Sequence, residues 1–285
     1  MKLITRNLKA YAKINLFLKV IKKEKKYHLL QSVFLYPEVF DKIEIFETSK
    51  KTEVKFYGPF GGLVNQKNNT VLKAIILLKK NKKFKNKNFI IKVKKNIPIG
   101  SGLGGGSSDA VCILNFLNKY YKLDIKNKDY LKYLRLLGHD AQVFNNYKPK
   151  FMSLKKIFTF KSKKVLQKKV LIIYPNIINS TETVFKRNKV FSKIISINKN
   201  LNLDQILSLS KYFGNDLERV VTKKSKRILN LLIYLKNLSG CTFSHMTGSG
   251  SACFAFFKDN AYLYRAIYNL RKQYKNYWIT SAKII

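Results

Sequence analysis

Hydrophobic and polar residues alternate in several stretches of the chain, and these stretches predict its strands. From residue 14 to residue 20 every second residue is aliphatic, which is the period-two pattern of a half-buried strand. Lys13 and Asn15 fall between these positions, so we expect both side chains on the face opposite the core. Similar patterns predict further strands within residues 33–46, 89–93, 170–174, 241–245, 252–257 and 278–284.

Longer stretches with helical periodicity predict helices at residues 70–80, 110–121, 129–137, 225–236 and 261–274. Asn69 or Thr70 is suited to cap the first of them, and Gly138 stands where a glycine commonly ends the third. The strands and helices do not follow a regular βαβ repeat, so the sequence favours the α+β class. An irregular, lysine-rich stretch at 147–170 predicts a boundary between two domains, residues 1–150 and 151–285.

Composition narrows the class of protein. The chain has 285 residues, of which 46% are hydrophobic, enough for a sizeable buried core. No apolar run approaches the roughly 18 residues of a membrane-spanning helix. The three cysteines, Cys112, Cys241 and Cys253, form no CxxC pair. We therefore expect free thiols in a reducing cytoplasm, and no metal site built from protein side chains.

The net charge has two interpretations. The chain has 57 Lys and Arg residues against 15 Asp and Glu residues, a net charge of +42. Such an excess is typical of proteins that bind nucleic acid or an anionic membrane. It also results from compositional drift in an A/T-rich genome, whose codons enrich Lys, Asn, Ile, Tyr and Phe together. Because the lysines are spread along the whole chain, we favour drift and expect no specific nucleic-acid or membrane partner.

Five glycines lie within seven residues, between a predicted strand and a predicted helix. Glycines let backbone N–H groups approach an anion closely, and the N-terminus of the following helix adds positive charge. We therefore predict a phosphate-binding loop, with a flexible hinge capped by Ser108 or Asp109 as the alternative. It is not a Walker A loop, because no Gly-Lys-Ser/Thr follows the glycines. The predicted loop consists of Pro98, Ile99, Gly100, Ser101, Gly102, Leu103, Gly104, Gly105, Gly106, Ser107 and Ser108.

Three segments resemble the motifs of one family and follow each other along the chain in the family's order. Residues 10–18 resemble the N-terminal strand motif of the GHMP kinases, residues 98–110 resemble their signature loop, and residues 247–254 resemble their C-terminal glycine motif. The resemblance covers nearly the whole chain. It extends to the branch of the family that phosphorylates a cytidine-diphosphate sugar alcohol in the non-mevalonate isoprenoid pathway, through residues 27–34, 138–144 and 214–218.

The resemblance implies the two-domain GHMP kinase fold, with a ribosomal-protein-S5-domain-2-like N-terminal domain and a ferredoxin-like C-terminal domain. It implies transfer of the γ-phosphoryl group of ATP, accompanied by Mg²⁺, to a tertiary hydroxyl group. Lys13 and Asp140 are the implied catalytic pair. A carboxylate can take the hydroxyl proton, and an ammonium group can stabilise the developing charge. The alternatives are a surface lysine and an aspartate that only caps a helix.

Further contacts are implied for the substrate and the nucleotide. Tyr27 would stack on the cytosine, and His28 would hydrogen-bond its edge. Each implied position has a structural alternative, such as a turn hydroxyl, a tight hairpin or a helix cap. The other implied substrate contacts are Asn15, Thr181, Gly248, Ser249 and Gly250, and the implied nucleotide contact outside the loop is Asn69.

The sequence also departs from the family pattern. Gln142 replaces the usual proline after the aspartate motif, and residues 146–158 contain no glycine. Since Lys13, Asp140 and the loop are intact, we expect the protein to be an active kinase. We also expect it to be a monomer or a weak homodimer. The alternatives are a GHMP kinase of the homoserine or mevalonate type, a basic nucleic-acid-binding protein, and an inactive relative kept as a binding module. Residues 27–28 and 215–218 argue against the first, and the dispersed lysines argue against the second.

Overall fold

The computed structural model describes residues 1–24, 27–138, 140–160, 168–198 and 200–285. The chain divides into two compact units, each made of several segments. Unit 2 takes segments from both sides of residue 150, so the domain boundary predicted there stays a prediction. Unit 1 consists of Met1–Ala12, Val39–Ile99 and Gly104–Tyr147, and unit 2 consists of Lys13–Glu38, Gly100–Leu103 and Lys148–Ile285.

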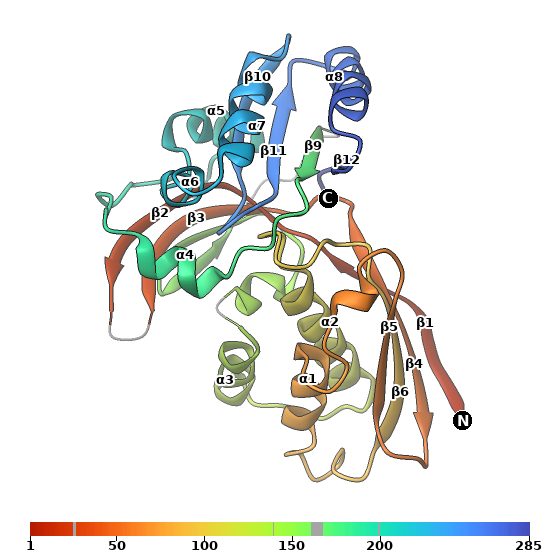
Figure 1. Ribbon diagram of the computed structural model, residues 1–285. Coiled ribbons are helices and arrows are strands. Elements are labelled where there is room, and N and C mark those ends of the chain that lie inside the picture. Colours follow the sequence, from red (N-terminus) through yellow and green to blue (C-terminus); the bar gives the residue numbers. More distant parts are fainter. Residues whose placement is uncertain (25–26, 139, 161–167, 199) are drawn as a thin grey trace. The chain divides into compact units, whose positions relative to one another are not determined.

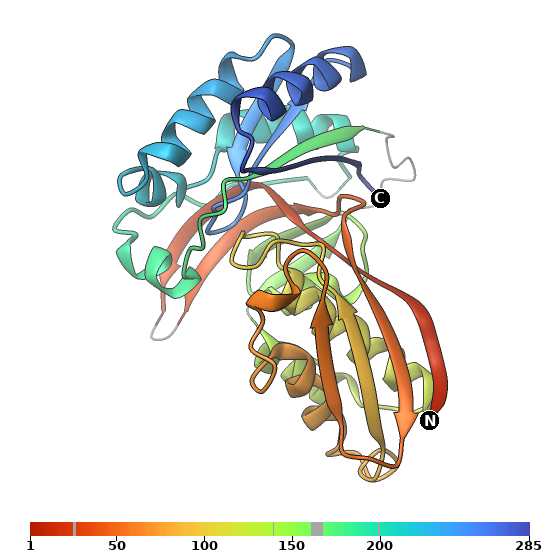
Figure 2. The same cartoon turned by 45° about the vertical axis from the view of Figure 1, so that its right-hand side comes forward.

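Unit 1 is built on a four-stranded sheet with the order β1-β4-β6-β5. β5 runs parallel to β6, and the other pairs are antiparallel. The helices of this unit gather on one side of the sheet in Figures 1 and 2. Its elements are β1 (Lys2–Tyr11), β4 (Phe40–Thr48), β5 (Glu53–Tyr57), β6 (Asn88–Lys94), α1 (Thr70–Leu78), α2 (Gly105–Tyr120), α3 (Asn127–Leu137) and the 3-10 turns η1 (Gly61–Leu63) and η2 (Ala141–Asn145).

Unit 2 contains two antiparallel sheets of four strands each. Their orders are β2-β3-β7-β8 and β10-β11-β9-β12. The strands are β2 (Ile14–Lys23), β3 (His28–Leu35), β7 (Lys150–Leu154), β8 (Lys156–Thr159), β9 (Lys169–Tyr174), β10 (Cys241–Met246), β11 (Cys253–Phe257) and β12 (Trp278–Lys283). The helices are α4 (Thr181–Arg187), α5 (Leu203–Phe213), α6 (Glu218–Thr222), α7 (Lys226–Asn237) and α8 (Asn260–Gln273).

Asn15 on β2 was expected on the face opposite the core, and this prediction is wrong. The register of β2 against β3 shifts between Asn15, which pairs with Phe34, and Phe17, which pairs with Val33. Because one extra residue reverses the alternation of faces, Asn15 lies on the same face as Leu18, a member of the core of unit 2. The strand is also not half-buried, since its residues 14–18 are buried on both faces.

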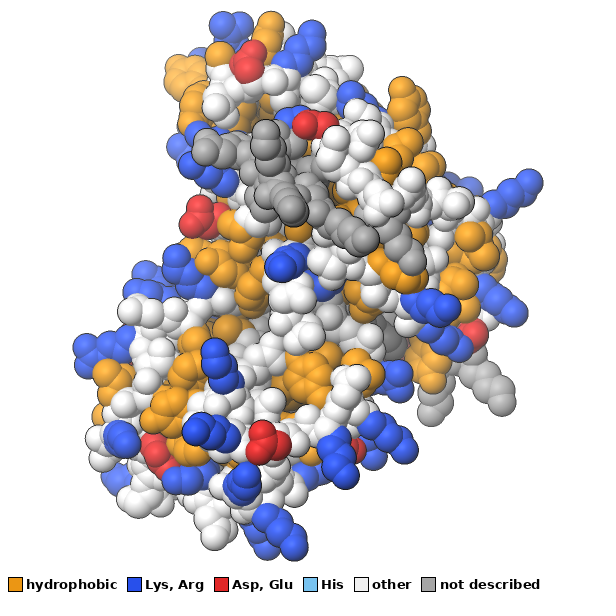
Figure 3. All heavy atoms as spheres, turned by 180° about the vertical axis from the view of Figure 1, so that it is seen from behind, with side chains coloured by type: hydrophobic (Ala, Val, Ile, Leu, Met, Phe, Trp, Pro, Cys, Tyr) orange, Lys and Arg blue, Asp and Glu red, His pale blue; other side chains and the backbone are white. Residues whose placement is uncertain are grey.

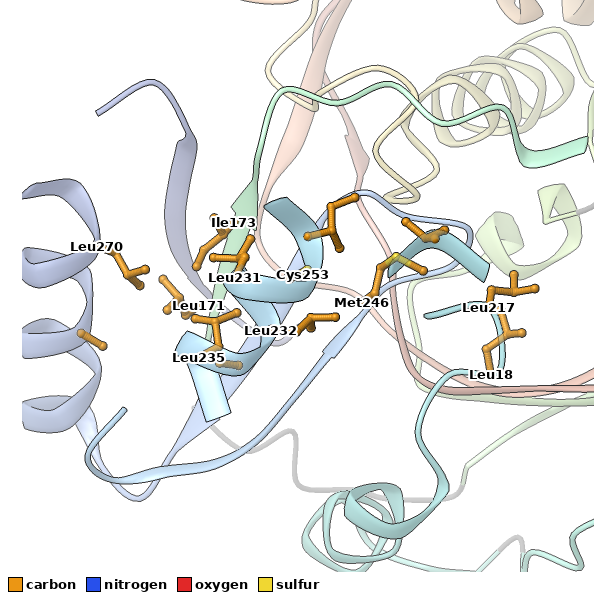
Figure 4. Packing of buried hydrophobic residues seen from close by; sticks show 14 of the residues in the cluster. Leu18, Leu171, Ile173, Leu217, Leu231, Leu232, Leu235, Met246, Cys253 and Leu270 are labelled. Atoms are coloured by element: carbon orange, nitrogen blue, oxygen red, sulfur yellow. The ribbon is translucent and has the colours of Figure 1, made fainter. Parts of the chain in front are cut away.

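The core of unit 2 joins β2 to the second sheet and its helices. Buried side chains from distant parts of the chain meet there, among them Leu18 on β2, Ile173 on β9, Leu235 on α7 and Leu270 on α8 (Figure 4). Burial of each leucine-sized side chain contributes about 1.5–3 kcal/mol. This cluster therefore fixes the position of β2 relative to β10 and β11.

Most predicted elements are present, with caps that explain where the helices begin. Asn69 accepts a hydrogen bond from the Leu72 N–H at the start of α1, and Ser225 accepts one from the Ile228 N–H at the start of α7. Such a cap contributes about 1 kcal/mol. The strands β1, β5, β7 and β8 and the helices α4, α5 and α6 were not predicted. The stretch expected to be irregular forms β7 and β8, while residues 161–167 lie outside the described residues.

No helix in the described ranges combines the length and the hydrophobicity that crossing a membrane requires.

Candidate active site

Lys13 precedes β2 directly and is held in a buried polar setting in unit 2. Its Nζ donates a hydrogen bond to Asn15 Oδ1 at 2.5 Å and lies 5.7 Å from the centre of the Phe34 ring. Asn15 donates through Nδ2 to Ser32 Oγ at 2.7 Å, and its backbone N–H donates to Thr247 Oγ1 at 2.9 Å. Because the Lys13 side chain is only 2% exposed, it is not a surface lysine, and its ammonium group is held by polar partners.

The turn between β10 and β11 lies against this ammonium group. A Cβ atom at Gly248 would lie 3.0 Å from Lys13 Nζ and 3.4 Å from Asn15 Oδ1. Gly248 also has a φ of +57°, a conformation that favours glycine. Asn215 holds the turn, because its Nδ2 donates to the carbonyl oxygens of Met246 at 2.7 Å and Gly248 at 2.8 Å. Both the turn and the approach of Lys13 therefore require glycine at position 248.

Four residues of the predicted phosphate loop, Gly100–Leu103, belong to unit 2. The Lys13 N–H donates to the Leu103 carbonyl at 2.9 Å, which ties this segment to the start of β2. A Cβ atom at Gly102 would lie 2.3 Å from the Thr247 carbonyl oxygen, so the loop backbone packs directly on the turn at 247–250. The structure thus brings Lys13, Asn15, this loop segment and the turn together.

Three members of the predicted substrate set lie in or beside the short helix α4. The His28 ring lies 5.2 Å from the Phe185 ring, with 31° between the ring planes. Thr181 Oγ1 and Ser249 Oγ share a hydrogen bond of 2.9 Å. Tyr27 is 51% exposed, so its ring is accessible to a ligand. A planar base can stack on such rings.

Phe185 was missed by the sequence analysis. Thr181 and Phe185 are four residues apart in α4, so they share one face of the helix. Ser180 caps α4 by accepting a hydrogen bond from the Thr183 N–H. In the sequence, a capping serine at position 180 followed by two residues four positions apart could have indicated that Phe185 lies beside Thr181.

Residues 104–108 of the predicted phosphate loop form the start of α2, in unit 1. Gly104 stands at the N-cap with a φ of +76°, and the first bond within the helix runs from the Ser108 N–H to the Gly104 carbonyl at 3.0 Å. The N–H groups before Ser108 therefore have no acceptor within the helix, and they carry the partial positive charge of its N-terminus. α1 begins alongside, because Thr70 Oγ1 donates to the Gly106 carbonyl at 2.7 Å. Adjacent helix N-termini are a suitable setting for phosphate.

The two serines of the loop have different surroundings. Ser108 is buried, and its hydroxyl donates to the Tyr11 carbonyl at 2.7 Å, which ties α2 to β1. Ser107 is half-buried, and a Cβ atom at Gly138 would lie 2.8 Å from its Oγ. Gly138 therefore brings the segment that contains Asp140 against the first turn of α2. Ser107 is the better placed for a phosphate, and contact of either serine with ATP stays a prediction.

Asp140 and Asn69 have different local roles. Asp140 is half-buried before η2, and its side chain makes no capping hydrogen bond to that turn. Asn69 caps α1, and its Nδ2 donates to the Gln66 carbonyl at 3.0 Å, so its contact with the nucleotide stays a prediction. Lys13 belongs to unit 2 and Asp140 to unit 1, so their action as a pair also stays a prediction.

Residues 214–218 hold β2 and the turn after β10 in place by hydrogen bonds. Asp216 Oδ2 accepts from the Val20 N–H at 2.8 Å, and Glu218 Oε1 accepts from the Met246 N–H at 2.9 Å. Together with Asn215, these residues clamp β2 and the turn that follows β10. The sequence analysis used this stretch only as a family feature, because the contacts join segments far apart in the chain.

The described part of the chain shows no metal-binding cluster of side chains. No group of three or more His, Cys, Asp or Glu residues that could hold a metal ion is found there.

Two family models match the chain. The model for the N-terminal domain of GHMP kinases matches residues 69–146, and the model for the C-terminal domain of GHMP kinases matches residues 194–276. The chain belongs to the GHMP kinase family. The family predicted from the sequence is therefore confirmed.

Similar GHMP kinases match almost over the full length. The 4-diphosphocytidyl-2-C-methyl-D-erythritol kinase of Anaplasma phagocytophilum (strain HZ) is 33% identical over 283 residues, which cover 98% of this chain and 94% of the relative. The kinase of the same name from Pelagibacter ubique (strain HTCC1062) is 33% identical over 282 residues, which cover 98% of each chain.

A solved structure confirms the predicted fold of this GHMP kinase. The crystal structure of a 4-(cytidine 5'-diphospho)-2C-methyl-D-erythritol kinase matches with a TM-score of 0.75 and 24% sequence identity. The match covers 96% of this chain and 98% of that chain.

Proposed function

We propose that this GHMP kinase transfers the γ-phosphoryl group of ATP to the 2-hydroxyl group of 4-diphosphocytidyl-2-C-methyl-D-erythritol, in the non-mevalonate pathway to isoprenoid precursors. The observation that carries this proposal is the 33% identity, over 98% of the chain, with two kinases of that name. The same relatives favour it over a homoserine or mevalonate kinase. On the face shown in Figure 3, Lys and Arg side chains are scattered and form no continuous stripe, which does not favour a nucleic-acid-binding protein.

The first turn of α2 is the proposed site for the phosphates of ATP. Its N–H groups are oriented for an anion, and the Thr70 hydroxyl fixes the Gly106 carbonyl beside them. The phosphate oxygens would hold Mg²⁺, which neutralises part of the charge on the transferred group. Contacts from the other residues of the loop and from Asn69 belong to the same proposal.

Asp140 is the proposed base, and Lys13 is the proposed electrostatic partner. Asp140 takes the proton of the acceptor hydroxyl as its oxygen forms a bond to the γ-phosphorus. The bond between that phosphorus and the bridging oxygen breaks, ADP leaves, and Asp140 later gives the proton to water. Lys13, held by Asn15 at 2.5 Å, stabilises the negative charge without having to reorganise.

The substrate is proposed to bind along unit 2. Tyr27, His28 and Phe185 offer aromatic rings for the cytosine base. Polar groups that can bind the diphosphate and the sugar alcohol lie on β2, in the turn at 247–250 and on α4. They are contributed by Asn15, Thr181, Gly248, Ser249 and Gly250.

The proposal includes a monomer or weak homodimer that acts in the cytoplasm, without a specific nucleic-acid or membrane partner. The three cysteines are all free thiols, which fits a reducing compartment. Size-exclusion chromatography with light scattering, with and without added RNA, tests the assembly and the partners.

Release of ADP, measured with ATP and Mg²⁺, tests the function. The acceptors are the cytidine-diphosphate methylerythritol, mevalonate and homoserine, each with the wild-type chain, Asp140→Asn and Asp129→Asn. Asp129 is an exposed residue in the first turn of α3, so its variant is the matched control. We expect turnover of the cytidine substrate alone, a loss of about 10²–10⁴-fold in kcat for Asp140→Asn, and wild-type kcat for Asp129→Asn. Turnover of another alcohol, or full activity of Asp140→Asn, would contradict the proposal.

A further inference from the structure

Three charged side chains meet in the interior of unit 1, next to the phosphate loop. Lys95, which follows β6, donates through Nζ to Asp41 Oδ2 and, at 2.6 Å, to Asp109 Oδ2. Asp41 lies on β4, and Asp109 lies on α2 directly after the two loop serines. Their exposed fractions are 0% for Asp41, 2% for Lys95 and 1% for Asp109. We call these residues the buried triad.

The buried triad is attached to both ends of the phosphate loop. Before the loop, Asp41 Oδ1 accepts hydrogen bonds from the Asn96 N–H at 2.6 Å and the Ile97 N–H at 2.9 Å. Within the loop, a Cβ atom at Gly105 would lie 3.3 Å from Asp41 Oδ2, and directly after the loop Asp109 is itself part of α2. The triad therefore sets the position of the first turn of α2 relative to β4 and the end of β6.

The charge balance of the buried triad is unusual. Two carboxylates face one ammonium group, so full ionisation would leave a net negative charge in the interior. Asp109 Oδ1 is buried and has no hydrogen-bond partner among the described residues. A buried carboxylate oxygen without a donor strongly disfavours the ionised form. The arrangement therefore favours a proton on Asp109, because Asp41 already accepts hydrogen bonds from two backbone N–H groups and from Lys95.

We propose that Asp109 is a positioning residue for ATP, which as a neutral acid orders the first turn of α2 without placing negative charge beneath the phosphates. This proposal rests on the function proposed above. The neutral form completes a balanced pair between Asp41 and Lys95. The ionised form adds a repulsive charge next to the anion site and weakens nucleotide binding.

The titration of Asp109 agrees with this geometry. Burial raises its pKa, Lys95 opposes the rise, and Asp41 adds to it, so that the pKa lies at about 8. The two carboxylates raise the pKa of Lys95 against the effect of burial, so the ammonium group stays charged. Among the described residues, the other titratable groups that interact with Asp109 are Cys112 on α2 and Tyr147 after η2, and burial raises the pKa of both.

Calorimetric titration with a non-hydrolysable ATP analogue and Mg²⁺, at pH 7 and pH 9, tests the proposal. For the wild type we expect the Kd to rise about tenfold between these pH values, the effect of one group with a pKa near 8. Asp109→Asn keeps the shape and the neutral state, so its Kd should match the wild type at pH 7 and change less than about twofold by pH 9.

Glu47→Gln is the matched control. Glu47 lies on β4, as Asp41 does, and pairs with Lys87 at 2.6 Å. The hydrogen bond from Lys87 lowers the pKa of Glu47, so this carboxyl group does not titrate between pH 7 and pH 9. The control should therefore show the same tenfold rise as the wild type. An equal pH dependence in Asp109→Asn, or a Kd for this variant at pH 7 that is already tenfold above the wild type, would overturn the proposal.

A second measurement uses only the wild-type chain, and so does not depend on the folding of a variant. Titrations at pH 8.5 in two buffers of different ionisation enthalpy give the number of protons taken up on binding. We expect uptake of about 0.5–1 proton per nucleotide, because binding selects the protonated form. Zero uptake together with normal nucleotide binding would overturn the role of Asp109 alone. Failure to bind the nucleotide at any pH would overturn the proposed function as well.

Discussion

Gly248→Ala is the substitution whose effect the structure defines most closely. The new methyl group would lie 3.0 Å from Lys13 Nζ and 3.1 Å from the Gly102 carbonyl oxygen. Contacts this short must open by a few tenths of an ångström, and the ammonium group is the easier of the two to move. The φ of +57° adds about 1–2 kcal/mol for any residue with a Cβ atom.

Two quantities should change in Gly248→Ala. The free energy of unfolding should fall by about 1–3 kcal/mol, from the backbone strain and the tight contacts. The kcat should fall by about 10–100-fold, because Lys13, the proposed electrostatic partner, would be displaced from its position. Urea denaturation measures the first quantity, and steady-state ADP release at saturating substrates measures the second.

Gly58→Ala separates these two effects. At Gly58, with φ +83°, a Cβ atom would lie 3.0 Å from a methylene of Lys94 and 3.2 Å from the Lys95 carbonyl oxygen. The geometry is therefore almost the same, but Gly58 lies in unit 1 and does not contact Lys13. Gly58→Ala should lose similar stability and keep wild-type kcat. Equal losses of kcat in the two variants, or full kcat in Gly248→Ala, would refute the role assigned to the contact between Gly248 and Lys13.

Three further predictions concern other parts of the chain. Asn215→Ala should lower kcat by about tenfold, since the turn at 247–250 loses two hydrogen bonds, and steady-state kinetics checks this. Burial lowers the pKa of Lys150 from 10.5 to about 7, so the unfolded chain binds more protons above pH 7. The wild type should then gain roughly 2 kcal/mol of stability between pH 7 and 9 relative to Lys150→Met, as measured by urea denaturation. Burial raises the pKa of Cys112 to about 12 and that of Cys253 well above its usual value, so iodoacetamide at pH 8 should label both thiols only after denaturation, as read by mass spectrometry.

Local patterns predicted the elements that have a strong period of their own. α1 and α7 begin at the predicted positions, because a capping side chain and a regular hydrophobic stripe coincide there. β1 was missed because, among the described strands, it pairs with β4 alone and leaves most of its residues exposed or half-exposed. β7 was missed because its pairing with β3 joins residues more than a hundred positions apart. Neither strand needs an alternating sequence when a neighbour fixes its register.

The candidate site also contains some features that the sequence could indicate and others that it could not. The predicted phosphate loop stands out in the sequence because five glycines fall within seven residues. The buried state of Asn15 could not, because it follows from a bulge in β2, which a period-two pattern does not reveal. The partnership of Asp109 with Asp41 and Lys95 joins three separate elements. The sequence offered Asp109 only as a possible helix cap.

The interleaved segments of the two units constrain how such a gene can recombine. A crossover near residue 150 would join β3 from one parent to β7 from another, although these strands pair directly in one sheet. It would also separate Gly102 from the turn at 247–250 on which it packs. A single exchange between diverged relatives therefore breaks matched surfaces, and a working hybrid needs several coordinated crossovers. Selection should consequently transmit this kinase as one inherited block, and libraries that shuffle it should keep residues 13–38, 100–103 and 148–285 from the same parent.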